Sequence, residues 1–222
     1  LYRKLTAWEV ELAESTDQSI KEVLTYQKSE ANQEFCKFVR RNYYNWINKR
    51  SDDTPVMSHT LMRTNIFPVA DENPKTTLLL IDNFRYDQWR SISSLLRGWY
   101  DVAQDDFYCA ILPTATQYAR NAVFAGLMPL AIDKLMPNKW LNDNEEGGKN
   151  QYEEEFLKRL MSQNGKSWKF SFDKLVRPEQ GRKLVDNIQK VYDADFSVIV
   201  YNFLDILSHA RTETDIIREL TE

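Results

Sequence analysis

The sequence predicts an α/β protein in which a mostly parallel sheet, flanked by helices, follows a helical N-terminal element. Short apolar runs alternate with amphipathic helical stretches from Thr76 onward, as in chains that form parallel sheets. Residues 1–51 carry helical periodicity alone, and a proline-containing segment separates the two regions. The 222 residues are enough for a sizeable buried core.

The first region is predicted to be helical with one break. The segment Ser15-Thr16-Asp17-Gln18 resembles a capping box and divides the region into two helices. Beyond the break, apolar residues recur at three- and four-residue steps, namely Ile20, Val23, Leu24, Ala31, Phe35, Phe38, Val39, Tyr43, Trp46 and Ile47. We interpret this aromatic-rich stripe as a packing face against another helix or domain, in a helical connector or docking element.

The next segment, residues 52–75, is irregular and rich in proline and small polar residues, which predicts an extended linker. A nearly continuous apolar strand then covers Thr76–Ile81 and ends at Asp82. A helix is predicted over residues 87–100. Its apolar residues are expected on an inner side, and they are Trp89, Ile92, Leu95, Leu96 and Trp99.

The segment around Thr116 organises the predicted fold. The apolar run Phe107–Leu112 is predicted to be a buried strand, followed by a tight Pro-Thr turn. A helix then opens on a hydroxyl residue and stops near Gly126. Backbone N–H groups at such a helix start stabilise a phosphate or a developing negative charge. A threonine there is also an ordinary helix cap, so both interpretations stay open at this point.

The remaining chain continues the alternation of helices and strands. In order, we expect short helices over 129–141, an exposed loop over 142–149, a helix over 151–161, an edge strand around 168–172, a helix over 180–192, a strand over 196–204 and a helix from 211 onward. These elements complete a sheet covered on both faces.

Composition narrows the class of protein. A net charge of −4, from 29 basic and 33 acidic residues, gives no sign of a general nucleic-acid surface or of binding to anionic membranes. Cys36 and Cys109 lie far apart in the sequence, which favours reduced cysteines in a cytoplasmic protein. No signal peptide and no apolar run long enough to cross a bilayer are found, so we expect no membrane insertion.

Three predicted strands end in residues suited to chemistry. Asp82 follows the first, Thr114 and Thr116 follow the second, and Asp205 follows the last, with His209 four residues later. Because the carboxyl ends of parallel strands lie along one edge of a sheet, we expect these residues to converge. A carboxylate and an imidazole at this spacing suit zinc. The alternatives are turn or helix caps and a structural Asp-His pair.

The order of these motifs resembles the alkaline phosphatase superfamily, including its nucleotide pyrophosphatase/phosphodiesterases. The shared features are an aspartate after an apolar strand, P-T-x-T followed by G-x-x-P, and Asp-x-x-x-His after another strand. The resemblance implies two zinc ions in the complete domain. It implies that Thr116 is the nucleophile and shares one zinc with Asp82, while Asp205 and His209 bind the other.

Two segments, IDNFRYDQW and LPTATQYARN, resemble more particularly the PglZ domain of that superfamily, as found in PorX-type response regulators of the type IX secretion system. The resemblance covers the chain from about Thr76 to the C-terminus, and the helical start is similar in kind to the linker bundle of those regulators. It implies a helical linker bundle over 1–51, an extended linker over 52–75 and the N-terminal part of a PglZ domain over 76–222.

This resemblance implies a zinc-dependent phosphodiesterase acting on linear or cyclic oligonucleotides, as the effector domain of a two-component response regulator that controls type IX secretion. The implied partners are the oligonucleotide or cyclic nucleotide substrate, a second copy in a homodimer, a histidine kinase acting through a receiver domain, and a sigma factor or secretion component. The alternatives are a non-catalytic signalling platform with the same fold, and a phosphomonoesterase or sulfatase of the same superfamily.

Three further residues are candidates for substrate binding. Arg120, one helical turn after Thr116, either binds a substrate phosphate or forms a surface salt bridge. Thr114 is an alternative nucleophile, a helper or a cap. Asn83, directly after Asp82, is a candidate contact to substrate, with support of a metal ligand or helix capping as the other roles.

The chain departs from the superfamily pattern in one respect. The superfamily completes its metal sites with a later Asp-His pair and a further histidine, whereas the two histidines here are His59 and His209. The chain starts with Leu1 rather than Met, and its helical pattern continues to Glu222. We therefore expect an excised piece of a longer protein, in which the remaining ligands and a receiver domain lie outside these 222 residues.

Overall fold

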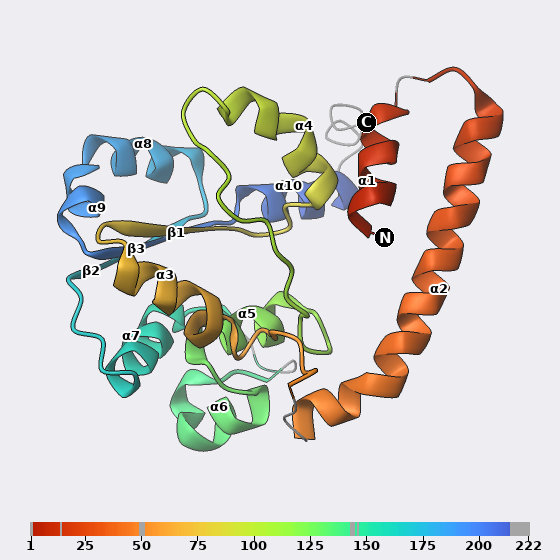
Figure 1. Ribbon diagram of the computed structural model, residues 1–222. Coiled ribbons are helices and arrows are strands. Elements are labelled where there is room, and N and C mark those ends of the chain that lie inside the picture. Colours follow the sequence, from red (N-terminus) through yellow and green to blue (C-terminus); the bar gives the residue numbers. More distant parts are fainter. Residues whose placement is uncertain (1, 14, 49–51, 143–144, 146, 214–222) are drawn as a thin grey trace. The chain divides into compact units, whose positions relative to one another are not determined.

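The computed structural model describes residues 2–13, 15–48, 52–142, 145 and 147–213 (Figure 1). The chain divides into two compact units. One is helical and consists of Leu1–Thr54 with Phe84–Asp105; the other is α/β and consists of Pro55–Asn83 with Asp106–Glu222. Part of the loop predicted over 142–149, and the final helix beyond Glu213, lie outside the described residues.

The helical unit contains α1 (Tyr2–Glu11), α2 (Gln18–Asn48) and α4 (Tyr86–Leu96). The predicted break between the first two helices is confirmed. The Asp17 carboxylate accepts hydrogen bonds from the backbone N–H groups of Ser19 (2.9 Å) and Ile20 (3.4 Å), which are among the donors that a helix start leaves unpaired.

The apolar residues of this unit are more exposed than their spacing predicts. In α2 the buried residue is Trp46, which packs against the rings of Phe38 and Tyr43. The rest of the predicted stripe is only partly buried or is exposed; the exposed members are Ile20, Val23, Phe35 and Phe38. The predicted inner side of α4 is wrong for Leu95 and Trp99, which are 75% and 82% exposed. The helix ends at Leu96, just before Gly98, and α4 packs along α1.

The α/β unit is built on a parallel three-stranded sheet with the order β1-β3-β2, which confirms the predicted fold class. The strands are β1 (Thr76–Ile81), β2 (Phe170–Leu175) and β3 (Phe196–Tyr201). Their last residues are in register, since Ile81 and Leu175 both pair with Tyr201. The three carboxyl ends therefore lie level along one edge, and β2 is an edge strand as predicted.

Helices cover both faces of this sheet (Figure 1). Three of them, α3 (Phe67–Glu72), α5 (Thr116–Ala125) and α7 (Glu153–Gln163), enclose the main core against Phe196, Val198 and Val200 of β3. The opposite face carries α8 (Pro178–Asp186) and α9 (Gln189–Asp193), to which Ser197 donates a hydrogen bond at the carbonyl of Val191 (3.2 Å). Because successive side chains of β3 point to opposite faces of the sheet, the strand contacts helices on both faces.

The segment predicted to be irregular, before β1, contains helix. A π-helix η1 (Met62–Ile66) runs directly into α3. Pro68 lies where the π-helix passes into α3, and the helical backbone continues through it. Met62 and Phe67 are buried in the core, which gives the segment a reason to fold. The predicted domain boundaries themselves stay predictions.

The strand predicted over Phe107–Leu112 is wrong. This segment forms one isolated parallel bridge, between Cys109 and Met57, and is not part of the sheet. Its backbone bonds instead to the segment around Ser58, whose N–H donates to the Cys109 carbonyl (3.2 Å). Ile111 is fully buried, while the larger side chains at its ends are about half exposed, so the apolar run is only partly covered.

The other elements follow the predicted order with shifted ends. Helices α6 (Pro129–Leu135) and η2 (Pro137–Lys139) confirm the short helices. The single helix predicted over 180–192 is two, α8 and α9, because Asn187 ends the first with a non-helical backbone conformation. The last helix, α10 (Phe203–Glu213), starts directly after β3 and includes Asp205 in its first turn. Among the described helices, none is long and apolar enough to span a membrane.

Candidate active site

The carboxyl edge of the sheet carries Asp82 after β1 and Asn202 after β3. Backbone hydrogen bonds continue the strand pairing to these residues, from Asp82 N–H to the Tyr201 carbonyl (3.0 Å) and from Asn202 N–H to the Leu175 carbonyl (2.9 Å). Asn83 then turns the chain with a left-handed backbone (φ 58°), and its backbone N–H donates to the Asp82 carboxylate. The side chain of Asp82 is thereby fixed at the sheet edge.

Helix α5 faces this edge and is firmly anchored at its far end. It stops at Gly126, which has φ 62° and no room for a side chain, because a Cβ there would lie 2.6 Å from Leu160 Cδ1. Arg63 donates a hydrogen bond to the Gly126 carbonyl (2.8 Å). Six consecutive residues of the helix, Arg120 to Ala125, are buried.

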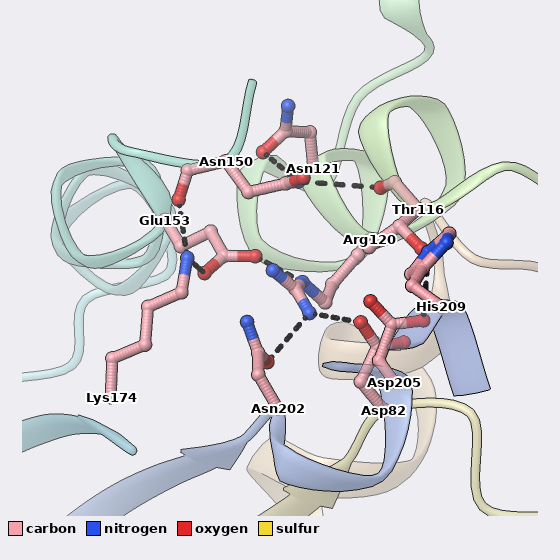
Figure 2. A network of polar contacts seen from close by, with 10 residues as sticks. All are labelled: Asp82, Thr116, Arg120, Asn121, Asn150, Glu153, Lys174, Asn202, Asp205 and His209. Carbon is pink, nitrogen blue, oxygen red and sulfur yellow. Dashed lines mark hydrogen bonds and ion pairs between the residues drawn. The ribbon is translucent and has the colours of Figure 1, made fainter. Parts of the chain in front are cut away.

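Arg120 connects α5 to the sheet edge. Its Nη1 donates to Asp82 Oδ2 at 2.6 Å and to Asn202 Oδ1 at 3.0 Å, and its Nε donates to Glu153 Oε1 (Figure 2). The Arg120 side chain is only 7% exposed. The predicted alternative of a surface salt bridge is therefore wrong, since the guanidinium lies in a buried network.

Glu153 and Lys174 extend this network to α7 and β2. Glu153 lies in the first turn of α7, where a carboxylate is favoured by the helix dipole, and its side chain is 1% exposed. Its Oε2 accepts a hydrogen bond from Lys174 Nζ at 2.9 Å, and Lys174 also donates to the Asn150 carbonyl at 2.8 Å. Two cations and two carboxylates thus tie all three strands to α5 and α7.

Asp205 and His209 form a second, more open pair on α10. Their side chains are 3.7 Å apart, as their four-residue spacing on a helix predicts, and His209 is 78% exposed. The charge of Asp205 acts on Asp82, so the two carboxylates lie within electrostatic reach of one another. In the view of Figure 2 they lie side by side, beside the Arg120 guanidinium.

The Asp82 carboxyl has a raised pKa. Burial is the largest cause, because it disfavours the charged form, and the negative charge of Asp205 acts in the same direction. Arg120 opposes this rise by attracting the carboxylate, without cancelling it. Two acidic groups therefore face each other in a partly desolvated place, which favours an added positive charge.

Thr116 is the first residue of α5 and Arg120 lies four residues later, so both project from the same side of the helix. The cap residue of this helix is Ala115, and no side-chain hydrogen bond caps the helix start. Thr116 is half buried, and its carbonyl accepts a hydrogen bond from Asn150 Nδ2 (3.3 Å). Thr114, in contrast, is exposed in the bend before the helix.

Sequence reasoning did not select Asn202, Glu153 or Lys174. Asn202 carries the same signal as Asp82, a polar residue directly after an apolar strand, and was available to that rule. Glu153 stands in a run of three glutamates, and no local pattern separates it from Glu154 and Glu155. Within the described residues, no group of three or more His, Cys, Asp or Glu side chains is arranged to hold a metal ion.

Comparison with known families defines the class of protein. Residues 61–222 match the family described as the BREX system PglZ alkaline phosphatase-like domain. The chain belongs to this family, and its parallel sheet with polar residues at the carboxyl edge is the framework that the match covers.

The match also extends to the helical start. Residues 1–47 match the PorX response regulator linker domain, so a PorX-type linker precedes the PglZ domain in this chain. Both parts of the resemblance seen in the sequence are thereby confirmed. No curated protein matches the chain.

Proposed function

We propose that this chain carries part of the active site of a metal-dependent phosphodiesterase that acts on linear or cyclic oligonucleotides, with Thr116 as the nucleophile. The observation that carries the proposal is the meeting of Asp82, Arg120 and Asp205 at the sheet edge, one helical turn from Thr116. These residues come from β1, α5 and α10, and a purely structural helix cap would not require them together.

The residues present suit a divalent cation such as zinc. Asp82 and Asp205 supply carboxylate oxygens and His209 supplies an imidazole nitrogen, which are common zinc ligands. Thr116 supplies a hydroxyl oxygen. Burial, and to a lesser extent the negative charge of Asp205, raises the pKa of the Asp82 carboxyl, and a bound cation would oppose both effects by attracting the carboxylate. Asp82 and Thr116 would hold one zinc ion, and Asp205 with His209 would hold another.

Bound zinc supplies a lowered pKa for an attached hydroxyl and neutralises negative charge on phosphoryl oxygens. The residues of the chain perform the remaining tasks. Thr116 Oγ1 loses its proton and forms the bond to phosphorus while the bond from phosphorus to one ester oxygen breaks. The departing ester oxygen takes up a proton and leaves as an alcohol. Water then cleaves the phosphothreonine and releases the monoester. The positive end of the α5 dipole stabilises the charge that develops at its start.

The PorX-type linker supports a place in two-component signalling. The family name of residues 1–47 refers to a response regulator, in which a histidine kinase acts on a receiver domain. We propose that the phosphodiesterase is the output of such a regulator, in a homodimer whose further partner is a sigma factor or secretion component. Substrate contacts are proposed for Asn83 and Thr114, which are exposed beside the site.

The experiment compares Thr116→Val with Thr114→Val in the full-length protein loaded with zinc. Thr116→Val is expected to lower hydrolysis of a short oligonucleotide by about a thousandfold or more, because the bond-forming oxygen is lost. Thr114→Val removes the same hydroxyl two residues earlier, at a proposed substrate contact, and is expected to lower the rate far less than Thr116→Val does. Unchanged hydrolysis by Thr116→Val would remove the proposed nucleophile.

Turnover of bis- and mono-nitrophenyl phosphate, measured on the same proteins, separates the diesterase from a phosphomonoesterase. We expect preference for the diester. An absence of turnover with zinc, for both substrates and for oligonucleotides, would favour the non-catalytic signalling platform.

A further inference from the structure

Glu153 needs an explanation beyond the proposed chemistry. Among the described residues, the charged residues that are buried are Arg120 and Glu153, and Glu153 is the more completely buried of the two. A buried carboxylate is costly unless it is paired on both oxygens, and Glu153 is paired with Arg120 through Oε1 and with Lys174 through Oε2. It lies away from the Asp205 and His209 pair in the view of Figure 2, so direct contact with metal is not its role.

Arg120 transmits the position of Glu153 to Asp82. The guanidinium is planar and rigid, and it uses Nε for Glu153 and Nη1 for Asp82 and Asn202. Once Glu153 fixes the Nε side of the plane, the direction in which Nη1 points is also fixed. The ion pair holds Oδ2 of Asp82, and the backbone N–H of Asn83 also donates to this carboxylate, so Arg120 and Asn83 together orient it.

The charges of the network also link Glu153 to cation binding at Asp82. Arg120 and Lys174 balance Asp82 and Glu153. A divalent cation on Asp82 would repel Arg120, and Glu153 offsets that repulsion by keeping a negative charge on the other side of the guanidinium. Without Glu153, Arg120 competes more strongly for Asp82 and the local potential becomes more positive, both of which weaken cation binding.

We infer that Glu153 is a positioning residue for Asp82, acting through Arg120, and that it sets the metal affinity of the site. This inference rests on the proposed function, in which Asp82 is a metal ligand. It assigns Arg120 to holding Asp82 in place rather than to binding the phosphate of a substrate.

The test measures zinc affinity of the metal-free full-length protein by competition with a chromogenic chelator. Glu153→Gln is expected to weaken zinc binding about tenfold or more, the size found when a residue behind a metal ligand is removed. Glu154→Gln and Glu155→Gln are matched controls on the same helix, where the carboxylates are 44% and 50% exposed and pair with Lys158 and Lys139. They are expected to stay within about twofold of wild type.

Two further proteins separate positioning from a general effect on the fold. Glu153→Asp keeps the charge but shortens the reach to Arg120, so a folded protein with weakened zinc binding is expected even if Glu153→Gln does not fold. In an Asp82→Asn background, Glu153→Gln is expected to cause little additional loss of zinc affinity, because its effect passes through Asp82.

Four outcomes decide the inference. The inference is supported if the wild-type protein binds zinc and both Glu153 variants bind it more weakly. It also requires that Glu153→Gln causes little further loss of zinc affinity in the Asp82→Asn background. Wild-type affinity in folded Glu153→Asp overturns it and leaves the proposed function intact. Equal losses with and without Asp82 also overturn it, since they indicate a general structural role. A wild-type protein that binds no zinc overturns both the inference and the proposed metal site.

Discussion

The two charged groupings at the sheet edge are built in opposite ways. The Arg120 network is buried, joins β1, β2, β3, α5 and α7, and satisfies each charge with at least one partner. The Asp205 and His209 pair lies on a single helix, and the His209 side chain is 78% exposed. One grouping depends on the whole fold of the unit, whereas the other needs only one helical turn.

This difference separates stability from ligand binding. Removing a partner from a buried ion pair leaves an uncompensated charge away from water, which is strongly destabilising. An exposed pair is worth little to the fold because water solvates both members. The buried network is therefore expected to maintain the geometry of Asp82, and the open pair is free to exchange water for a cation.

The most severe test of the comparison is Arg120→Met. We expect it to lower the free energy of unfolding by about 3–5 kcal/mol, because the buried Glu153 and the partly buried Asp82 lose the cation that they share. Urea denaturation at neutral pH measures the change. Lys158→Met, which removes a cation from an exposed pair with Glu154 on α7, is the control and should cost less than about 1 kcal/mol. Equal losses in the two variants would contradict the contrast.

The second test uses pH. The Asp82 pKa is raised by burial and by Asp205, so the folded protein binds the proton of this group more tightly than the unfolded chain does. Wild-type stability should therefore fall as pH rises from the pKa of an unfolded aspartate to the raised folded pKa. Asp82→Asn should lack this part of the decline.

The measured quantity is the difference in unfolding free energy between wild type and Asp82→Asn over that pH range. As pH rises, the wild type should lose stability relative to Asp82→Asn, and above the raised pKa of Asp82 the difference should become constant. Asp205→Asn serves as the companion, since removing its charge should narrow the range by lowering the Asp82 pKa. Parallel stability curves for wild type and Asp82→Asn would show that Asp82 titrates normally.

The smallest effect on the fold is expected for His209→Ala. Because the imidazole is largely exposed, the free energy of unfolding should change by less than about 0.5 kcal/mol. Zinc affinity, measured on the same protein, should fall clearly. A large loss of stability with unchanged zinc binding would reverse the roles of the two groupings.

The strand-end rule located Asp82 because it depends on local sequence, namely an apolar strand followed by an acid. It was less accurate for Asp205, since β3 ends at Tyr201 and Asp205 lies in the first turn of α10. The same kind of reasoning failed for Phe107–Leu112, where an apolar run of strand length makes only one bridge, to Met57. Periodicity cannot tell whether a neighbouring strand is available to pair. It also placed Leu95 and Trp99 on an inner face that the folded unit leaves exposed.

The sequence by itself determined the three strands of the sheet, the main helices, the family motifs and the candidate nucleophile, since these follow from side-chain periodicity and from short motifs. Tertiary structure alone decided that Arg120 is buried and that Glu153, rather than Glu154 or Glu155, is its partner. The physical reason is separation along the chain. Arg120 lies 38 residues from Asp82 and 82 from Asn202, and only the folded sheet brings these side chains within hydrogen-bonding distance of Arg120.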